Sequence, residues 1–244
     1  MKSASLRRTA RRATRAGIVT CISTIAITAT ARAAPHTNLF IAGGQYANSS
    51  QSAYLGAILP LPGGTLGKGF FVSPFAGWNR YTFQKNGQTF TGSEPSASVA
   101  IGRAWDEPDF NLSLSVAGGY SNTTVTPYAP KGSFHGGQWF AEPEIYAQLK
   151  LPAGATATVN GGYLTGMRSY WSSAYLLVPV SPSIAIGPEA DFGGGINYRS
   201  RTFALRVADK LTSSLDVDLS AGATTNLPGP YHPYVALNLS VPFR

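Results

Sequence analysis

The sequence predicts an all-β protein: an antiparallel transmembrane β-barrel of about 12 strands, with about 10 as the alternative count, following a cleaved signal peptide. Three observations lead to this fold class. Apolar residues alternate with small or polar residues along most of the chain. Only 12% of the residues are charged, against about a quarter in a typical soluble domain. Tryptophans and tyrosines fall near the predicted strand ends, where membrane interfaces would lie.

Residues 1–33 have the pattern of a secretory signal peptide. Basic residues from Lys2 to Arg15 precede an apolar stretch, 16–29, which falls short of the roughly 20 apolar residues of a spanning helix. Small residues up to Ala33 fit a cleavage site there. A twin-arginine signal is the alternative, but no cofactor motif that would require folded export follows. We expect residues 34–244 to form one barrel domain.

Most of the positive charge belongs to this signal peptide. The chain has 19 Lys and Arg residues against 11 Asp and Glu residues, a formal net charge of +8. Seven of the basic residues lie within residues 1–33, so the mature chain keeps 12 against 11 and carries +1. This near-neutral charge gives no reason to expect nucleic acid as a partner. The single cysteine, Cys21, also lies in the signal, which excludes disulfides, thiolate metal sites and cysteine nucleophiles.

The alternation with period two divides the mature chain into twelve strands. The predicted strands are 38–46, 53–60, 70–83, 89–105, 110–126, 137–151, 155–168, 170–180, 184–199, 202–210, 214–225 and 233–243. Short turns are predicted at 106–109, 152–154, 181–183 and 211–214, and longer connections at 47–52, 127–137 and 226–233. An even count places both termini, with most short turns, on the periplasmic side of an outer membrane.

Individual strands show an apolar face and a polar face. From Phe110 to Ala117, large apolar residues alternate with Asn, Ser and Ala, and the ranges 139–151, 215–222 and 235–243 repeat the pattern. The last strand, with Phe243 before the final arginine, resembles the terminal strand by which outer-membrane proteins are recognised for assembly. Apolar and polar residues would also alternate in a soluble all-β protein. The positions of the aromatic residues are therefore stronger evidence for a membrane barrel. The tryptophans expected at the membrane interfaces are Trp78, Trp105, Trp139 and Trp171.

Several charged residues fall on the faces predicted to point into the barrel. They are Glu142, Glu144, Glu189, Asp191, Arg206, Asp216 and Asp218, with Lys150 on the same face as the first two. A charge on the lipid face costs about 2 to 4 kcal/mol near the midplane, so these side chains should face the lumen or lie at the rim. Pairing between neighbouring strands is expected, because a buried charge without a partner is costly. Two interpretations remain: a satisfied network that fills a narrow barrel, and a polar passage for a small solute.

No catalytic, cofactor-binding or metal-binding residues are predicted, and we expect a protein that is not an enzyme. The chain has three histidines, His36, His135 and His232, and none lies on a predicted strand face beside a serine and a carboxylate. Paired glycines at 43–44, 118–119, 161–162 and 193–195 lie within strands with no helix following, so they do not predict a phosphate-binding loop. They indicate bends in the wall or close approach of an aromatic ring.

Several short segments resemble the cellulose biosynthesis protein BcsS family, outer-membrane barrels of α-proteobacteria. These segments are 53–57 (AYLGA), 59–64 (LPLPGG), 169–171 (SYW), 186–189 (IGPE) and 197–199 (NYR), and their order and spacing also fit, from Leu39 to Phe243. The resemblance implies an outer-membrane component that is accessory to cellulose production and secretion. It supplies no catalytic residues.

The expected partners are outer-membrane lipid and, through the resemblance, cellulose or cellulose-secretion proteins, and the sequence leaves the oligomeric state open. The expected role is docking or a narrow pore. Extrusion of a glucan through the lumen is disfavoured, because aromatic and charged side chains compete for a small interior. A small-solute porin and a lipid-modifying outer-membrane enzyme are the alternatives.

Overall fold

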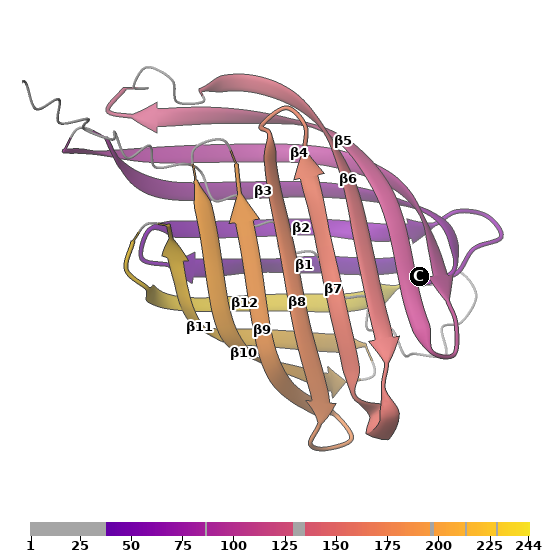
Figure 1. Cartoon of the computed structure of the whole chain (residues 1–244). Coiled ribbons are helices and arrows are strands. Elements are labelled where there is room, and N and C mark those ends of the chain that lie inside the picture. Colours follow the sequence, from indigo (N-terminus) through magenta and orange to yellow (C-terminus); the bar gives the residue numbers. More distant parts are fainter. Residues whose placement is uncertain (1–37, 86, 129–134, 196–197, 213, 228) are drawn as a thin grey trace, which may run out of the picture.

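The chain forms a closed antiparallel barrel of twelve strands, seen in a computed structural model that describes residues 38–85, 87–128, 135–195, 198–212, 214–227 and 229–244 (Figure 1). The strands are β1 (Asn38–Ala47), β2 (Ser50–Pro60), β3 (Gly69–Lys85), β4 (Gln88–Asp106), β5 (Phe110–Thr126), β6 (Gly136–Lys150), β7 (Thr156–Leu164), β8 (Ser169–Pro179), β9 (Ile184–Gly194), β10 (Arg199–Thr212), β11 (Leu215–Asn226) and β12 (His232–Phe243). A short 3-10 helix, Pro152–Gly154, lies between β6 and β7. The predicted fold class and the predicted count of twelve are therefore confirmed.

The first and last strands close the barrel. β1 pairs with β12 from Asn38 opposite Phe243 to Ala47 opposite Tyr234. The start of β1 and the end of β12 therefore lie at one end of the barrel, which we call the terminal end, and the opposite end is the distal end. The four predicted short turns all lie at the terminal end, as expected for an even number of strands. The predicted signal peptide, 1–33, lies outside the described residues.

Several predicted boundaries are wrong, among them the strand predicted over 202–210, which is Arg199–Thr212. The strand predicted over 155–168 ends at Leu164, and the strand predicted over 184–199 ends at Gly194. In both places the sequence has no proline that would mark the strand end, so the pattern alone does not locate it. The longer connection predicted at 47–52 is a two-residue turn between β1 and β2. Residues 50–52 are small and polar and extend β2 beyond its apolar part.

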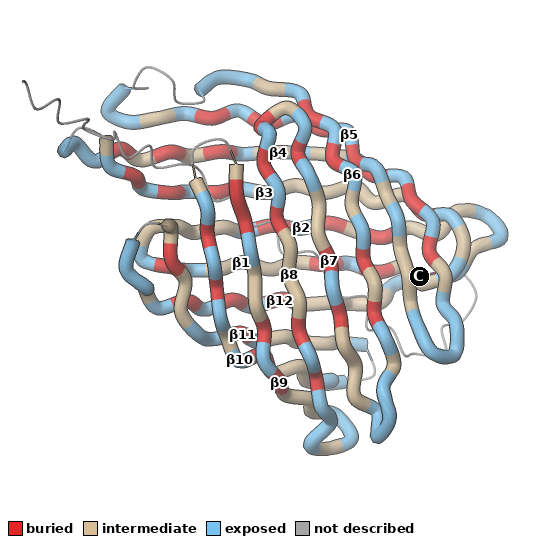
Figure 2. Tube along the Cα trace, in the orientation of Figure 1, coloured by how far each residue is buried: buried red, intermediate tan, exposed pale blue. Residues whose placement is uncertain are grey.

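Burial alternates along the strands as the two-faced wall requires (Figure 2). On β6, Phe140, Glu142 and Tyr146 are buried, whereas Trp139 and Ile145, at odd-numbered positions, are exposed. Buried side chains point into the barrel and exposed side chains point outward. Among the described residues, no helix is long and apolar enough to cross a membrane.

β3, β4 and β5 are the longest strands, with 17, 19 and 17 residues. At the distal end their paired tips extend beyond the neighbouring strand β2, whose pairing with β3 reaches only to Tyr81 (Figure 1). The inner face of this extension carries Tyr81, Phe83 and Phe90, whose rings stack with centroids 6.1 and 5.3 Å apart. These rings form a buried apolar cluster at the distal mouth.

The glycine pairs lie where an aromatic ring approaches the backbone, as predicted. A Cβ on Gly119 would lie 2.4 Å from the Phe140 ring, and one on Gly162 would lie 2.8 Å from Trp171 Nε1. Gly43 and Gly194 are covered in the same way by Tyr54 and Tyr170. The neighbouring ring fills the space that a side chain would occupy.

Gly187 provides a test of this packing. A Cβ at this buried position of β9 would lie 1.6 Å from the Leu176 carbonyl oxygen of β8, so the backbone must shift. We expect Gly187→Ala to destabilise the barrel by about 1 to 3 kcal/mol, measured by urea unfolding monitored as heat-modifiable gel migration. Gly118→Ala is the control, because nothing lies within 4 Å of its Cβ position. Equal stability of the two variants would contradict the packing described here.

Candidate functional site

The outer surface carries an apolar band between two girdles of aromatic residues. At the distal end the outward aromatic residues include Tyr46, Trp78, Tyr120, Trp139, Tyr163, Tyr170, Phe192 and Phe203, and at the terminal end Phe40, Phe70, Phe110 and Phe243. Trp78 lies eight positions after Phe70 on β3, and Tyr120 lies ten positions after Phe110 on β5. At about 3.4 Å per residue and a tilt of about 40°, the band is roughly 20 to 26 Å tall. This height matches the hydrocarbon core that such barrels span.

Trp171 does not belong to these girdles, contrary to the prediction. Its side chain is 4% exposed, points into the barrel and donates a hydrogen bond from Nε1 to Glu142 Oε1 at 2.6 Å. The residues after it on β8, Ser172, Ser173 and Ala174, are small on both faces. Because neither face of this stretch is larger or more apolar than the other, the sequence does not indicate which face of β8 points inward.

The inner wall contains an ion-paired group that we call the Arg206 cluster. Arg206 on β10 contacts Asp218 on β11 at 2.7 Å and Glu189 on β9 at 3.4 Å. Ser220 donates a hydrogen bond to Glu189 Oε2 at 2.6 Å. The guanidinium carbon lies 4.2 Å from the centre of the Tyr175 ring on β8, a cation–π contact. Four adjacent strands thus hold one arginine, and opposite charges on neighbouring strands are paired here.

Glu142 and Glu144 form a separate group that has no ion pair with a described residue. Glu142 is 2% exposed and accepts the hydrogen bond from Trp171, and Glu144 accepts one from Ser115 on β5 at 3.0 Å. Both carboxylates lie on the inner wall. The predicted pairing with a cation is not found for these two residues among those described, and neutral donors on β8 and β5 take its place. Lys150, on the same face, lies at the terminal rim and pairs with Asp106 at 2.9 Å.

The other two predicted residues extend the Arg206 cluster. Asp191 lies inward on β9, hydrogen-bonded to Ser173 and close to Glu189. Asp216 lies near the terminal rim on β11, opposite Lys210 of β10. The sequence interpretation missed Glu94, which is 1% exposed on β4 and accepts a hydrogen bond from Thr123 at 3.1 Å. The alternation of Phe90, Gly92 and Glu94 within the predicted strand was a sufficient signal for its inward position.

Side chains from the whole circumference converge at the level of the Arg206 cluster, which we call the waist. β2, β6 and β10 divide the strand order into thirds. Tyr54 on β2 donates a hydrogen bond at 2.5 Å to Asn238 of β12, which pairs with Asp218 of β11. Tyr146 on β6 packs with Tyr175, whose ring contacts Arg206. Large buried side chains from three sides therefore occupy the lumen at this level.

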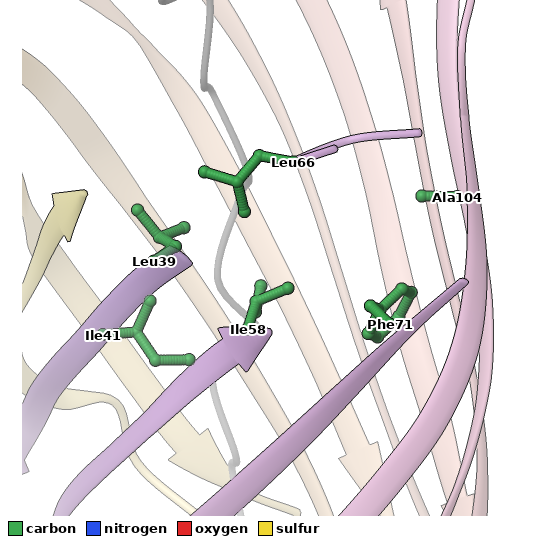
Figure 3. Packing of buried hydrophobic residues seen from close by; sticks show 6 residues of the cluster. All are labelled: Leu39, Ile41, Ile58, Leu66, Phe71 and Ala104. Carbon is green, nitrogen blue, oxygen red and sulfur yellow. The ribbon is translucent and has the colours of Figure 1, made fainter. Parts of the chain in front are cut away.

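The terminal end is packed with apolar side chains inside the barrel (Figure 3). Leu39 and Ile41 of β1, Ile58 of β2 and Phe71 of β3 form a buried cluster with Ala104 and Leu66. Leu66 comes from the connection 61–68 between β2 and β3, so this connection folds inward over the β1–β4 side of the opening. Apolar side chains therefore fill that side of the terminal opening.

The inner wall carries mostly negative charge. Six inward carboxylates lie between the two rims, on Glu94, Glu142, Glu144, Glu189, Asp191 and Asp218. Within the part of the chain that the structure describes, Arg206 is the inward cation between the rims. An aqueous path along this wall would favour cations over anions.

The described residues hold no group of three or more His, Cys, Asp and Glu side chains placed to bind a metal ion. His135 and His232 both lie at the distal end, one before β6 and the other at the start of β12. Within the described ranges, neither histidine forms a hydrogen bond or ion pair with a serine or a carboxylate. His36 lies outside those ranges.

The closed strand order, the apolar band and the aromatic girdles define an outer-membrane β-barrel. The family model for cellulose biosynthesis protein BcsS matches residues 39–243, from β1 to the last residue of β12. The chain belongs to this family, and the resemblance seen in the sequence is confirmed. The protein is thus an outer-membrane barrel linked to cellulose biosynthesis.

Solved structures with the same fold include channels and transport units. An outer membrane channel from Pseudomonas putida F1 has 11% identity and a TM-score of 0.59, covering 90% of this chain and 100% of the other. The transport unit of the autotransporter AIDA-I from Escherichia coli has 9% identity and a TM-score of 0.54, covering 92% and 94%. The KdgM porin has 11% identity and a TM-score of 0.50, covering 84% and 99%. At these identities the likeness shows the fold alone. No curated protein matches the chain.

Proposed function

We propose that this protein is a non-enzymatic outer-membrane barrel that assists the synthesis and secretion of cellulose. Residues 1–33 are removed on export, and both termini of the mature barrel face the periplasm. The observation that carries the proposal is the extent of the family match. It covers β1 to β12 without a further domain, so the barrel itself is the part that the family shares.

The waist supports an accessory role over transport of the polymer. Arg206, Tyr54 and Tyr146 are buried inside the barrel on three different sides, and the apolar cluster around Leu66 covers part of the terminal opening. A glucan chain would have to displace paired charges and packed aromatic residues to pass. The rims and the distal extension of β3–β5 are then the surfaces available for docking other parts of the secretion system.

A strain lacking this protein tests the proposal. We expect secreted cellulose, measured as acid-insoluble glucan, to fall and to return when the full chain is supplied. In the same strain, planar-bilayer recordings with the purified barrel should show little conductance, because the waist is narrow. Wild-type cellulose levels in the deletion strain would overturn the accessory role.

The acidic inner wall favours a second candidate function, a small-solute porin. In that case the purified barrel would conduct steadily and select cations, because six inward carboxylates outnumber the inward arginine. Conductance of this kind together with unchanged cellulose would favour the porin over the accessory factor.

A further inference from the structure

Basic residues without acidic neighbours gather on the outer surface of the distal end. The exposed arginines there are Arg80, Arg168, Arg199 and Arg201. All 11 acidic residues of the chain lie in its described part, and each is either inside the barrel or at the terminal end. None of the four arginines forms an ion pair with a described residue. The distal rim is therefore a positively charged surface.

Three of these arginines lie together around β8, β9 and β10. Arg199 and Arg201 are two positions apart on the outer face of β10. Arg199 pairs with Gly194 of β9, and Gly194 pairs with Tyr170 of β8, so Arg199 and Tyr170 are two strands apart, or about 10 Å. Arg168 lies two residues before Tyr170 in the turn between β7 and β8. We call Arg168, Arg199 and Arg201 the distal arginine group.

This group lies directly beside the outward aromatic residues of the distal girdle. Arg201 pairs with Phe192 of β9, whose ring contacts Phe203 edge to face at 6.2 Å. The ring of Tyr231 lies 6.5 Å from Phe203. A Cβ on Gly194 would lie 2.7 Å from the Tyr170 ring, so this ring leans over β9 toward Arg199. Guanidinium groups thus border an apolar surface at the level of the lipid headgroups.

We propose that the distal arginine group binds the phosphate of a lipid in the outer leaflet, namely the phosphorylated headgroup of lipid A. Arginine binds phosphate through two parallel N–H donors, which suits a fixed headgroup better than a diffuse counterion. The adjacent rings of Phe192, Phe203 and Tyr170 would contact the acyl chains of the same lipid. A soluble anion would use the arginines alone, whereas a lipid uses both surfaces.

The distal arginine group is expected to meet the outer leaflet because of where it lies in the barrel. With both termini periplasmic, as proposed above, the distal end lies at the cell surface, where lipid A forms the outer leaflet. The terminal end has a mixed rim, in which Asp106, Glu107, Asp109 and Asp209 accompany the basic residues. The charge difference between the two rims would favour this orientation once lipid A is bound.

The test uses the full barrel purified in detergent, with binding of bisphosphorylated lipid A measured by native mass spectrometry. At about 1 kcal/mol per basic residue, each Arg→Gln change in the group should weaken binding about fivefold, and the triple variant about a hundredfold. Arg103→Gln is the matched control. Arg103 also lies outward beside aromatic rings, 5.4 Å from Phe70 and 5.0 Å from Trp105, but at the terminal end. This control should bind as the wild type does.

Further measurements test whether the bound phosphate belongs to a lipid or to a soluble anion, and whether the distal end of the barrel faces the cell exterior. Dephosphorylated lipid A should bind the wild type as weakly as intact lipid A binds the triple variant. Inorganic pyrophosphate should not compete. In whole cells, the introduced thiol of a Gln88→Cys variant, at the distal start of β4, should react with an impermeant maleimide, because the mature chain has no other cysteine.

Equal binding by the triple variant and the wild type would overturn the proposal, and so would strong competition by pyrophosphate or a distal end shielded from the maleimide. Unchanged heat-modifiable migration of each variant shows that the barrel still folds. The binding assay does not depend on cellulose production, so the proposed function and this inference can fail separately.

Discussion

Replacing Arg206 with methionine is expected to destabilise the barrel by about 3 to 5 kcal/mol. The substitution leaves Glu189 and Asp218 facing each other near the waist without their cation, while Ser220 still donates to Glu189. Both ion-pair contacts are lost, as is the guanidinium that lies on the Tyr175 ring. The measurement is the urea midpoint of the folded band in detergent, followed by heat-modifiable migration.

A variant that also removes the two carboxylates distinguishes the effect of unpaired charge from the effect of lost packing. Adding Glu189→Gln and Asp218→Asn to Arg206→Met removes the unpaired carboxylates, so a large part of the stability should return. Arg206→Lys keeps the charge but cannot reach both carboxylates with a planar fork, and it should fall between the wild type and the methionine variant. A methionine variant as stable as the wild type would mean that the cluster is hydrated and contributes little.

The second large effect is expected on the lipid face. Val116→Arg places a charge midway along the outward face of β5, six residues from Phe110 and four from Tyr120. Near the midplane of the bilayer such a charge costs about 2 to 4 kcal/mol, whereas near the interfaces the cost is about 0 to 1 kcal/mol. The measurement is the free energy of unfolding from lipid vesicles, by tryptophan fluorescence in urea or guanidinium.

Thr124→Arg is the control on the same strand and the same face. Thr124 is exposed beyond the distal girdle, above Tyr120, so the introduced arginine reaches water. Equal costs for Val116→Arg and Thr124→Arg would show that the band around Val116 does not lie in hydrocarbon, and would contradict the orientation of the barrel in the membrane.

The strand count and the two faces of the wall could be predicted because the alternation within each strand reflects lipid on one side and the lumen on the other. Phe110 to Ala117 and Trp139 to Leu151 alternate without interruption, and a wall between lipid and lumen requires that alternation. The inward positions of Glu142, Glu189 and Arg206 follow from the same parity. The strand ends at Leu164 and Gly194 could not be predicted, because no proline follows them closely enough to mark the boundary.

The partners of the inward side chains depended on which strands are neighbours and how they are aligned. Arg206 meets Asp218 and Glu189 because β10 lies between β9 and β11, whereas Glu142 meets Trp171 across β7. The distal arginine group likewise comes from two segments more than 30 residues apart. A sequence with period two specifies the face of each residue, since side-chain direction is local. Contacts across the wall and the lumen arise only when the barrel closes, because register and closure fix which faces meet.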